Sequence, residues 1–139
     1  MSAWRLWIGI VLILHGVGHL LGVLALTPLG GENWNARSWL LTDSVGEAPA
    51  KAISTVLWVI GLVLFVVAGL ALLQIGFPES WWKPVAVAGA LLSFIALTLF
   101  WNAFPVLFPN KIGAIAVNLT VLIGVLISDW PTAEMLAAN

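Results

Sequence analysis

The sequence has no cysteine, and charged residues make up only 8% of its 139 residues. Without cysteine there are no disulfides, thiolate zinc sites or iron–sulfur clusters. Soluble globular domains carry about 25% charged residues, and disordered chains are also polar and charged. A chain that is 62% hydrophobic fits neither class, so its composition predicts an integral membrane protein.

Several function classes lack their characteristic residues. The five basic residues are scattered over four loops and form no patch, so we expect no nucleic-acid partner. No glycine loop that could bind phosphate precedes a lysine, and no Ser/His/acid set is evident. We therefore predict no catalytic residues and favour a protein that is not an enzyme by itself.

The positions of the charged residues divide the chain into four apolar stretches. The charge-free intervals are 26, 27, 27 and 17 residues long, at 6–31, 52–78, 84–110 and 112–128. About 20 helical residues cross the hydrocarbon core, and a spanning segment must satisfy its own backbone hydrogen bonds. The sequence thus predicts an all-α fold, in which a four-transmembrane-helix antiparallel bundle forms one membrane domain over residues 1–139.

Proline, glycine and tryptophan mark the ends of these spans. Helices are expected at about 4–26, 46–76, 81–104 and 111–129, with an extramembrane loop over 27–45. Six of the nine tryptophans lie at the predicted ends, where the ring suits the membrane interface: Trp4, Trp7, Trp81, Trp82, Trp101 and Trp130.

The membrane orientation rests on weaker signals. An even number of spans places both termini on one side, but basic residues are nearly balanced between the two sides, two against three. The net-acidic segment 27–50 favours termini in the cytoplasm. We expect a multi-pass protein of a bacterial inner membrane.

The most specific polar feature within a span is the pair His15 and His19. Their i, i+4 spacing places both rings on one helix face, about 16 Å or more from Trp4 and so near the bilayer midplane. Two histidines at this spacing can share a metal ion, but no carboxylate, cysteine or further histidine lies in any span, so we predict no metal site. A haem or chlorophyll-type ring on one histidine is a second interpretation.

A third interpretation is helix packing. Gly18 and Gly22 form a small-xxx-small motif for close helix approach, and matching depths along antiparallel helices place Asn118 at the level of His19. A His19–Asn118 hydrogen bond is therefore expected, with Ser93 and Thr98 at similar depth. The candidate ligand-binding residues for a quinone, whose carbonyl oxygens accept hydrogen bonds, are these same polar residues: His15, His19, Ser93, Thr98 and Asn118.

The loop between the first two spans is the other distinctive segment. Loops of this length often carry structure or function. Trp34 and Trp39 lie on either side of Arg37. They could form a short interfacial helix that caps the bundle or contact a partner protein, because exposed tryptophan and arginine are common interface anchors.

The chain also resembles the DoxX-type small membrane proteins. The resemblance rests on Arg5 before the first span, the stretch Leu14-His15-Gly16-Val17-Gly18-His19-Leu20, and the four-span layout. It implies a four-helix bundle associated with membrane redox, as a hydrophobic partner of quinone-linked oxidoreductases. Cysteine-dependent chemistry of that group does not carry over, since this chain has no cysteine.

Two functions follow as hypotheses. The first is an accessory or anchoring subunit of a membrane redox complex, which contacts the lipid bilayer and either a membrane-protein partner or further copies of itself. The alternative is a redox ligand-binding protein that uses His15 and His19 for a quinone or a tetrapyrrole.

Overall fold

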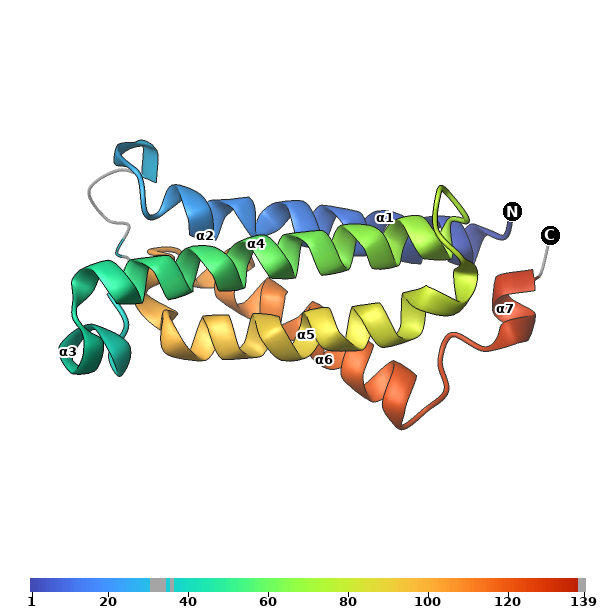
Figure 1. Cartoon of the computed structure of the whole chain (residues 1–139). Coiled ribbons are helices and arrows are strands. Elements are labelled where there is room, and N and C mark those ends of the chain that lie inside the picture. The colour runs from blue at the N-terminus through green and yellow to red at the C-terminus, as the bar shows by residue number, and fades with distance from the viewer. Residues whose placement is uncertain (31–34, 36, 138–139) are drawn as a thin grey trace.

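The structure is a computed structural model that describes residues 1–30, 35 and 37–137 (Figure 1). Over these residues it is all-α and contains no strand. The α-helices are α1 (Ala3–Gly18), α2 (Leu20–Leu24), α3 (Leu41–Val45), α4 (Glu47–Leu72), α5 (Trp82–Leu99), α6 (Ile112–Leu126) and α7 (Ala133–Ala137). Shorter turns are η1 (Pro28–Gly30), η2 (Glu79–Trp81), η3 (Trp101–Ala103) and η4 (Leu107–Lys111).

Among the described residues, four helical segments are long and apolar enough to cross a membrane. They comprise 22, 26, 21 and 20 residues, at Ala3–Leu24, Glu47–Leu72, Glu79–Leu99 and Leu107–Leu126. They pack antiparallel along a common direction, with the two chain ends at one end of the bundle and α3 at the other (Figure 1). The predicted four-helix membrane fold is confirmed, and the chain is a multi-pass membrane protein by helix length and composition.

The described helices end earlier than the sequence suggests. α4 ends at Leu72, several residues before 76, because the chain turns at Gln74 (φ 60°) and Gly76 (φ 74°), and positive φ cannot continue a helix. α5 ends at Leu99 because Phe100 leaves the helical region (φ −118°, ψ 41°).

α4 is the central helix of the bundle. It packs against both α1 and α5, whereas α6 packs mainly on α5 and makes few close approaches to α1. Figure 1 shows α6 crossing α5 at an angle. The seam between α1 and α6 is therefore the loosest one among the four spans.

Glycines allow the close approach of α1 and α4. A Cβ added at Gly69 would lie 2.7 Å from the carbonyl oxygen of Gly9, and one at Gly16 would lie 3.0 Å from the backbone of α4. Gly22 packs directly on the Trp58 ring, but Gly18 has no atom within 4 Å of an added Cβ. The predicted packing role is therefore wrong for Gly18, which points away from α4.

The bundle core consists of two apolar clusters. One lies toward the chain ends and includes Leu12, Leu72 and Trp82, and the other lies toward the opposite end and includes Trp58 and Phe100. Along the first span, α5 and α6, one buried polar side chain each lies between the residues of the two clusters: His19, Ser93 and Asn118.

The chain ends are tied together by Arg5. Its guanidinium donates to the backbone carbonyls of Leu72 at 2.9 Å and Leu136 at 3.4 Å, and it pairs with Glu79 at 2.7 Å. These bonds satisfy backbone carbonyls at the C-terminal end of α4 and in α7, which have no hydrogen-bond partner within their own helices.

Candidate functional site

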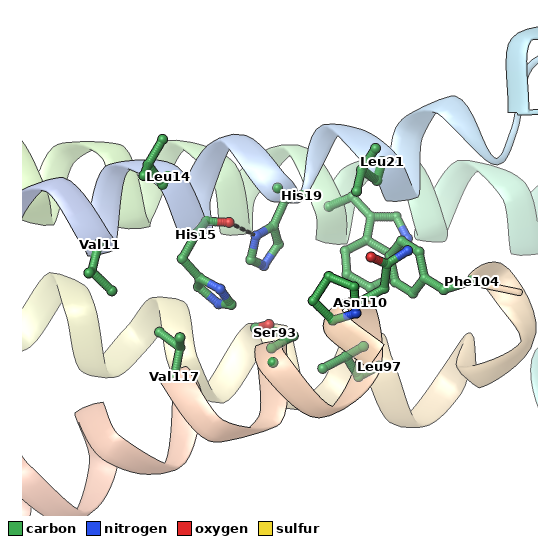
Figure 2. A pocket seen from close by; sticks show the side chains of 15 residues that line it. Val11, Leu14, His15, His19, Leu21, Ser93, Leu97, Phe104, Asn110 and Val117 are labelled. Atoms are coloured by element: carbon green, nitrogen blue, oxygen red, sulfur yellow. Dashed lines mark hydrogen bonds between the residues drawn. The ribbon is translucent and has the colours of Figure 1, made fainter. Parts of the chain in front are cut away.

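The first span is interrupted at His19, between α1 and α2. The His19 backbone N–H donates to the carbonyl of Gly16, three residues earlier, at 3.0 Å. In a regular α-helix it would bond to the carbonyl of His15, four residues earlier. That carbonyl instead accepts a 2.9 Å hydrogen bond from Nδ1 of the His19 ring (Figure 2). The His19 ring thus bonds to the carbonyl that the break in the helix leaves free, so the break and the orientation of the side chain depend on each other.

His15 is the histidine that reaches α6. Its Nε2 lies 3.0 Å from Oδ1 of Asn118, and Nδ2 of Asn118 donates to Oγ of Ser93 at 2.8 Å. The expected His19–Asn118 hydrogen bond is therefore wrong by one helical turn. The depth estimate assumed straight helices, whereas α6 crosses the bundle at an angle.

These partners fix which ring nitrogens carry hydrogen. Both partners of the histidines are acceptors, namely the His15 carbonyl and the Asn118 side-chain oxygen. A neutral imidazole has a single N–H, so it lies on Nδ1 in His19 and on Nε2 in His15. The remaining nitrogens, Nε2 of His19 and Nδ1 of His15, are then hydrogen-bond acceptors.

The His19 acceptor is unsatisfied within the described part of the chain. His19 is only 4% exposed, and its Nε2 is buried with no hydrogen-bond partner. The ring packs between Phe65 and Trp58, at centroid distances of 5.5 and 5.7 Å, and close to the backbone of α4 at Gly61. A buried unsatisfied polar atom costs about 1–3 kcal/mol, so an acceptor kept in this position requires an explanation.

A cavity of about 390 Å³ adjoins both histidines. It lies between α1 and α6, and its walls are mostly apolar (Figure 2). The lining side chains include His15, His19, Trp58, Ser93, Leu97, Phe104 and Asn110. Leu14 and Val11 also line it and are 64% and 46% exposed, so the cavity opens sideways on a surface that lipid would cover.

Sequence reasoning missed three polar or aromatic contributors to this cavity, Trp58, Phe104 and Asn110. Asn110 precedes α6 and lies on the Phe104 side of the cavity, away from His15 (Figure 2). Trp58 stands inside the second span, and its indole N–H bonds to Ser54 at 3.1 Å. Unlike the other tryptophans, Trp58 lies a few turns from either end of its helix. This position was the sequence signal that could have pointed to its role in the cavity.

The other predicted residues lie apart from the histidines. Thr98 has an exposed side chain, and its carbonyl accepts a 2.7 Å hydrogen bond from the Trp39 indole. Arg37 pairs with Asp43 at 3.0 Å on the surface, and Trp39 is 63% exposed. A short helix does follow, α3, although it begins after Trp39. Trp34 lies outside the described residues.

Metal ligation would require more donors than the site brings together. In the described ranges there is no group of three or more His, Cys, Asp or Glu side chains that could hold an ion. The two histidine rings are 5.1 Å apart and perpendicular, and each has one nitrogen committed to a protein acceptor.

The chain was compared with protein-family models, curated proteins and solved structures, and none of these comparisons yields a match.

Proposed function

We propose that this protein binds a small hydroxylated aromatic ring of the quinol type in the cavity beside His15 and His19. The observation that carries the proposal is the buried, unpaired Nε2 of His19, a residue that lines an apolar cavity. Cavities of about 300–1,000 Å³ with few, well-placed polar groups are typical of small-molecule sites.

The ligand should donate hydrogen bonds to the protein. Both free ring nitrogens are acceptors, so they match a hydroxyl group better than a carbonyl oxygen. This favours the reduced hydroquinone over the quinone that the sequence suggested. The Asn110 side chain, which both donates and accepts, would meet a second hydroxyl at the other end of the ring.

Contact with Nε2 requires a movement of the His19 ring. The atom is fully buried, so the ring must turn toward the cavity when a hydroxyl binds. A tetrapyrrole fits less well: its broad disc, centred on Nε2, would collide with α4, because an added Cβ on Gly61 already lies 2.9 Å from that nitrogen.

A matched pair of ligands tests the proposal. The probes are 2-methyl-1,4-naphthohydroquinone and its 1,4-dimethyl ether, titrated anaerobically by calorimetry into the protein in lipid nanodiscs. The two share a ring system, but only the first donates hydrogen bonds. One hydrogen bond contributes about 0.5–1.5 kcal/mol, so we expect up to about a tenfold preference for the hydroquinone.

Protein variants assign the preference to the site. His19→Phe keeps a ring between Trp58 and Phe65 but removes the acceptor, and it should abolish the preference. Trp39→Phe, at the far surface, is the control and should retain it. Equal binding of the hydroquinone and the ether by the unchanged protein, or an undiminished preference in His19→Phe, would show that the proposal is wrong.

An accessory or anchoring subunit is the second candidate function, and one observation favours it. Of the four spans, Leu107–Leu126 has the smallest share of its surface covered by the rest of the chain, which leaves α6 available to a membrane-protein partner. A redox complex in a bacterial inner membrane would agree with the DoxX-type resemblance, and the net-acidic segment 27–50 favours termini in the cytoplasm. Cysteine-specific crosslinking from Ile123→Cys in native membranes would test it, with Val59→Cys on α4 as the control.

A further inference from the structure

A second hollow lies in the same seam between α1 and α6. Its volume is about 350 Å³, and it extends toward the chain ends, where tryptophans surround it. Its walls are almost entirely apolar; they come from α1, α6 and the segment after α6 and include Trp7, Ile8, Ala116, Thr120 and Trp130.

The two hollows adjoin each other. Val11 of α1 and Val117 of α6 line both of them, and Figure 2 shows these two side chains at the end of the first cavity, farthest from Phe104. Along the first span, α1 and α2, the lining runs from Trp4 to Leu21, a length of about 25 Å at the helical rise. The hydrocarbon core is about 30 Å thick, so the combined groove follows most of its depth.

We infer that the ligand is a tailed lipid-soluble quinol, with its ring at the histidines and its hydrocarbon tail in the groove between α1 and α6. The inference rests on the proposed function and names the ligand class more closely. The polar groups of the seam are concentrated at one end of the groove, at His15, His19 and Asn110, whereas the other end offers an apolar channel. A molecule with one polar ring and one long apolar chain matches this division.

The small residues of α6 support the same inference. Ala116 and Thr120 are both exposed on the groove wall. Their size keeps the channel open. On neighbouring faces of the same helix, the bulky Leu119 and Ile123 are 44% and 48% exposed and do not line the groove.

Photolabelling can locate the tail. The probe is a prenylated naphthohydroquinone with a diazirine near the end of its tail, bound to the full chain in nanodiscs and mapped by peptide mass spectrometry. We expect labels on the groove walls, at residues 4–12 of α1 and 116–125 of α6. Ala116→Trp should remove most of this label because it fills the channel, whereas Leu119→Trp should leave it unchanged.

Three results would overturn the inference. The first is labelling spread equally over lipid-facing residues outside the groove, such as Val59 and Leu91. The second is a groove label that is unaffected by Ala116→Trp. The third is equally strong groove labelling by a diazirine phospholipid, with no competition from the quinol, which would make the groove a site for an ordinary acyl chain.

Binding of the untailed ring separates failure of this inference from failure of the proposed function. If the short hydroquinone still depends on His19 while the tail labels elsewhere, only the tail placement is wrong. If the short hydroquinone shows no dependence on His19, the proposed function is wrong as well, and the groove inference fails with it.

Discussion

Adding one methyl group at Gly61 should disrupt the histidine site from the opposite helix. A Cβ at this position would lie 2.6 Å from Cδ2 and 2.9 Å from Nε2 of His19. Carbon atoms pack best at about 3.5–4.0 Å, so the ring would have to move by about 1 Å. Phe65 and Trp58 flank the ring and oppose that movement.

The energetic cost follows from these contacts. Overpacking of a well-packed core costs about 1–3 kcal/mol, and a displaced ring also weakens the 2.9 Å bond from Nδ1 to the His15 carbonyl. Polar interactions within membrane bundles average about 0.6 kcal/mol. Replacement of glycine by alanine inside a helix stabilises the fold by about 0.5–1 kcal/mol, which offsets part of this cost. The expected net destabilisation by Gly61→Ala is therefore about 0.6–3 kcal/mol.

The assay is unfolding in mixed micelles with increasing SDS, followed by circular dichroism. Gly18→Ala is the matched control, because its new Cβ would have no atom within 4 Å and should leave stability unchanged or slightly raised. If Gly61→Ala proves as stable as Gly18→Ala, then His19 does not pack against α4 as described, and the argument for a confined acceptor is refuted.

Three further predictions concern the bonds around the bundle. Asn118→Leu removes the acceptor of the His15 ring and should cost about 0.6–1.7 kcal/mol in the same unfolding assay; an unchanged midpoint would contradict the assigned bond. Arg5→Met should release the C-terminal segment, because the carbonyl and Glu79 contacts are lost, and faster proteolysis near residue 132 would report it; an unchanged cleavage rate would argue against the tie. Trp39→Phe removes one hydrogen bond to α5 and should lower stability by about 0.5–1.5 kcal/mol, whereas no change would mean that solvent replaces that bond.

The positions of charged residues were sufficient to predict the architecture. Isolated charges at positions such as Arg5, Lys51 and Lys111 bound the apolar stretches, and bilayer thickness then fixes how many helices can form. Helix ends were less certain. The end of α4 depends on a positive φ at Gln74, a conformation that the identity of glutamine does not predict.

The candidate site was only partly predictable. The i, i+4 spacing correctly placed the two histidine rings together, 5.1 Å apart. It could not tell which one would meet Asn118, because that depends on the tilt of α6 and on the break in the first span at His19. Gly16, not Gly18, packs against α4 for a similar reason: the rotation of α1 about its axis is set by its neighbours.

The sequence by itself determined that this is a four-span helical membrane protein with two histidines on one face of the first span, since spans and helix faces follow from local periodicity and the thickness of the bilayer. Two features came from the tertiary structure alone: His19 keeps an unpaired acceptor, and two adjoining apolar hollows lie between α1 and α6. Both features depend on the angle and spacing at which separate helices pack, and these arise from contacts between residues far apart in the chain.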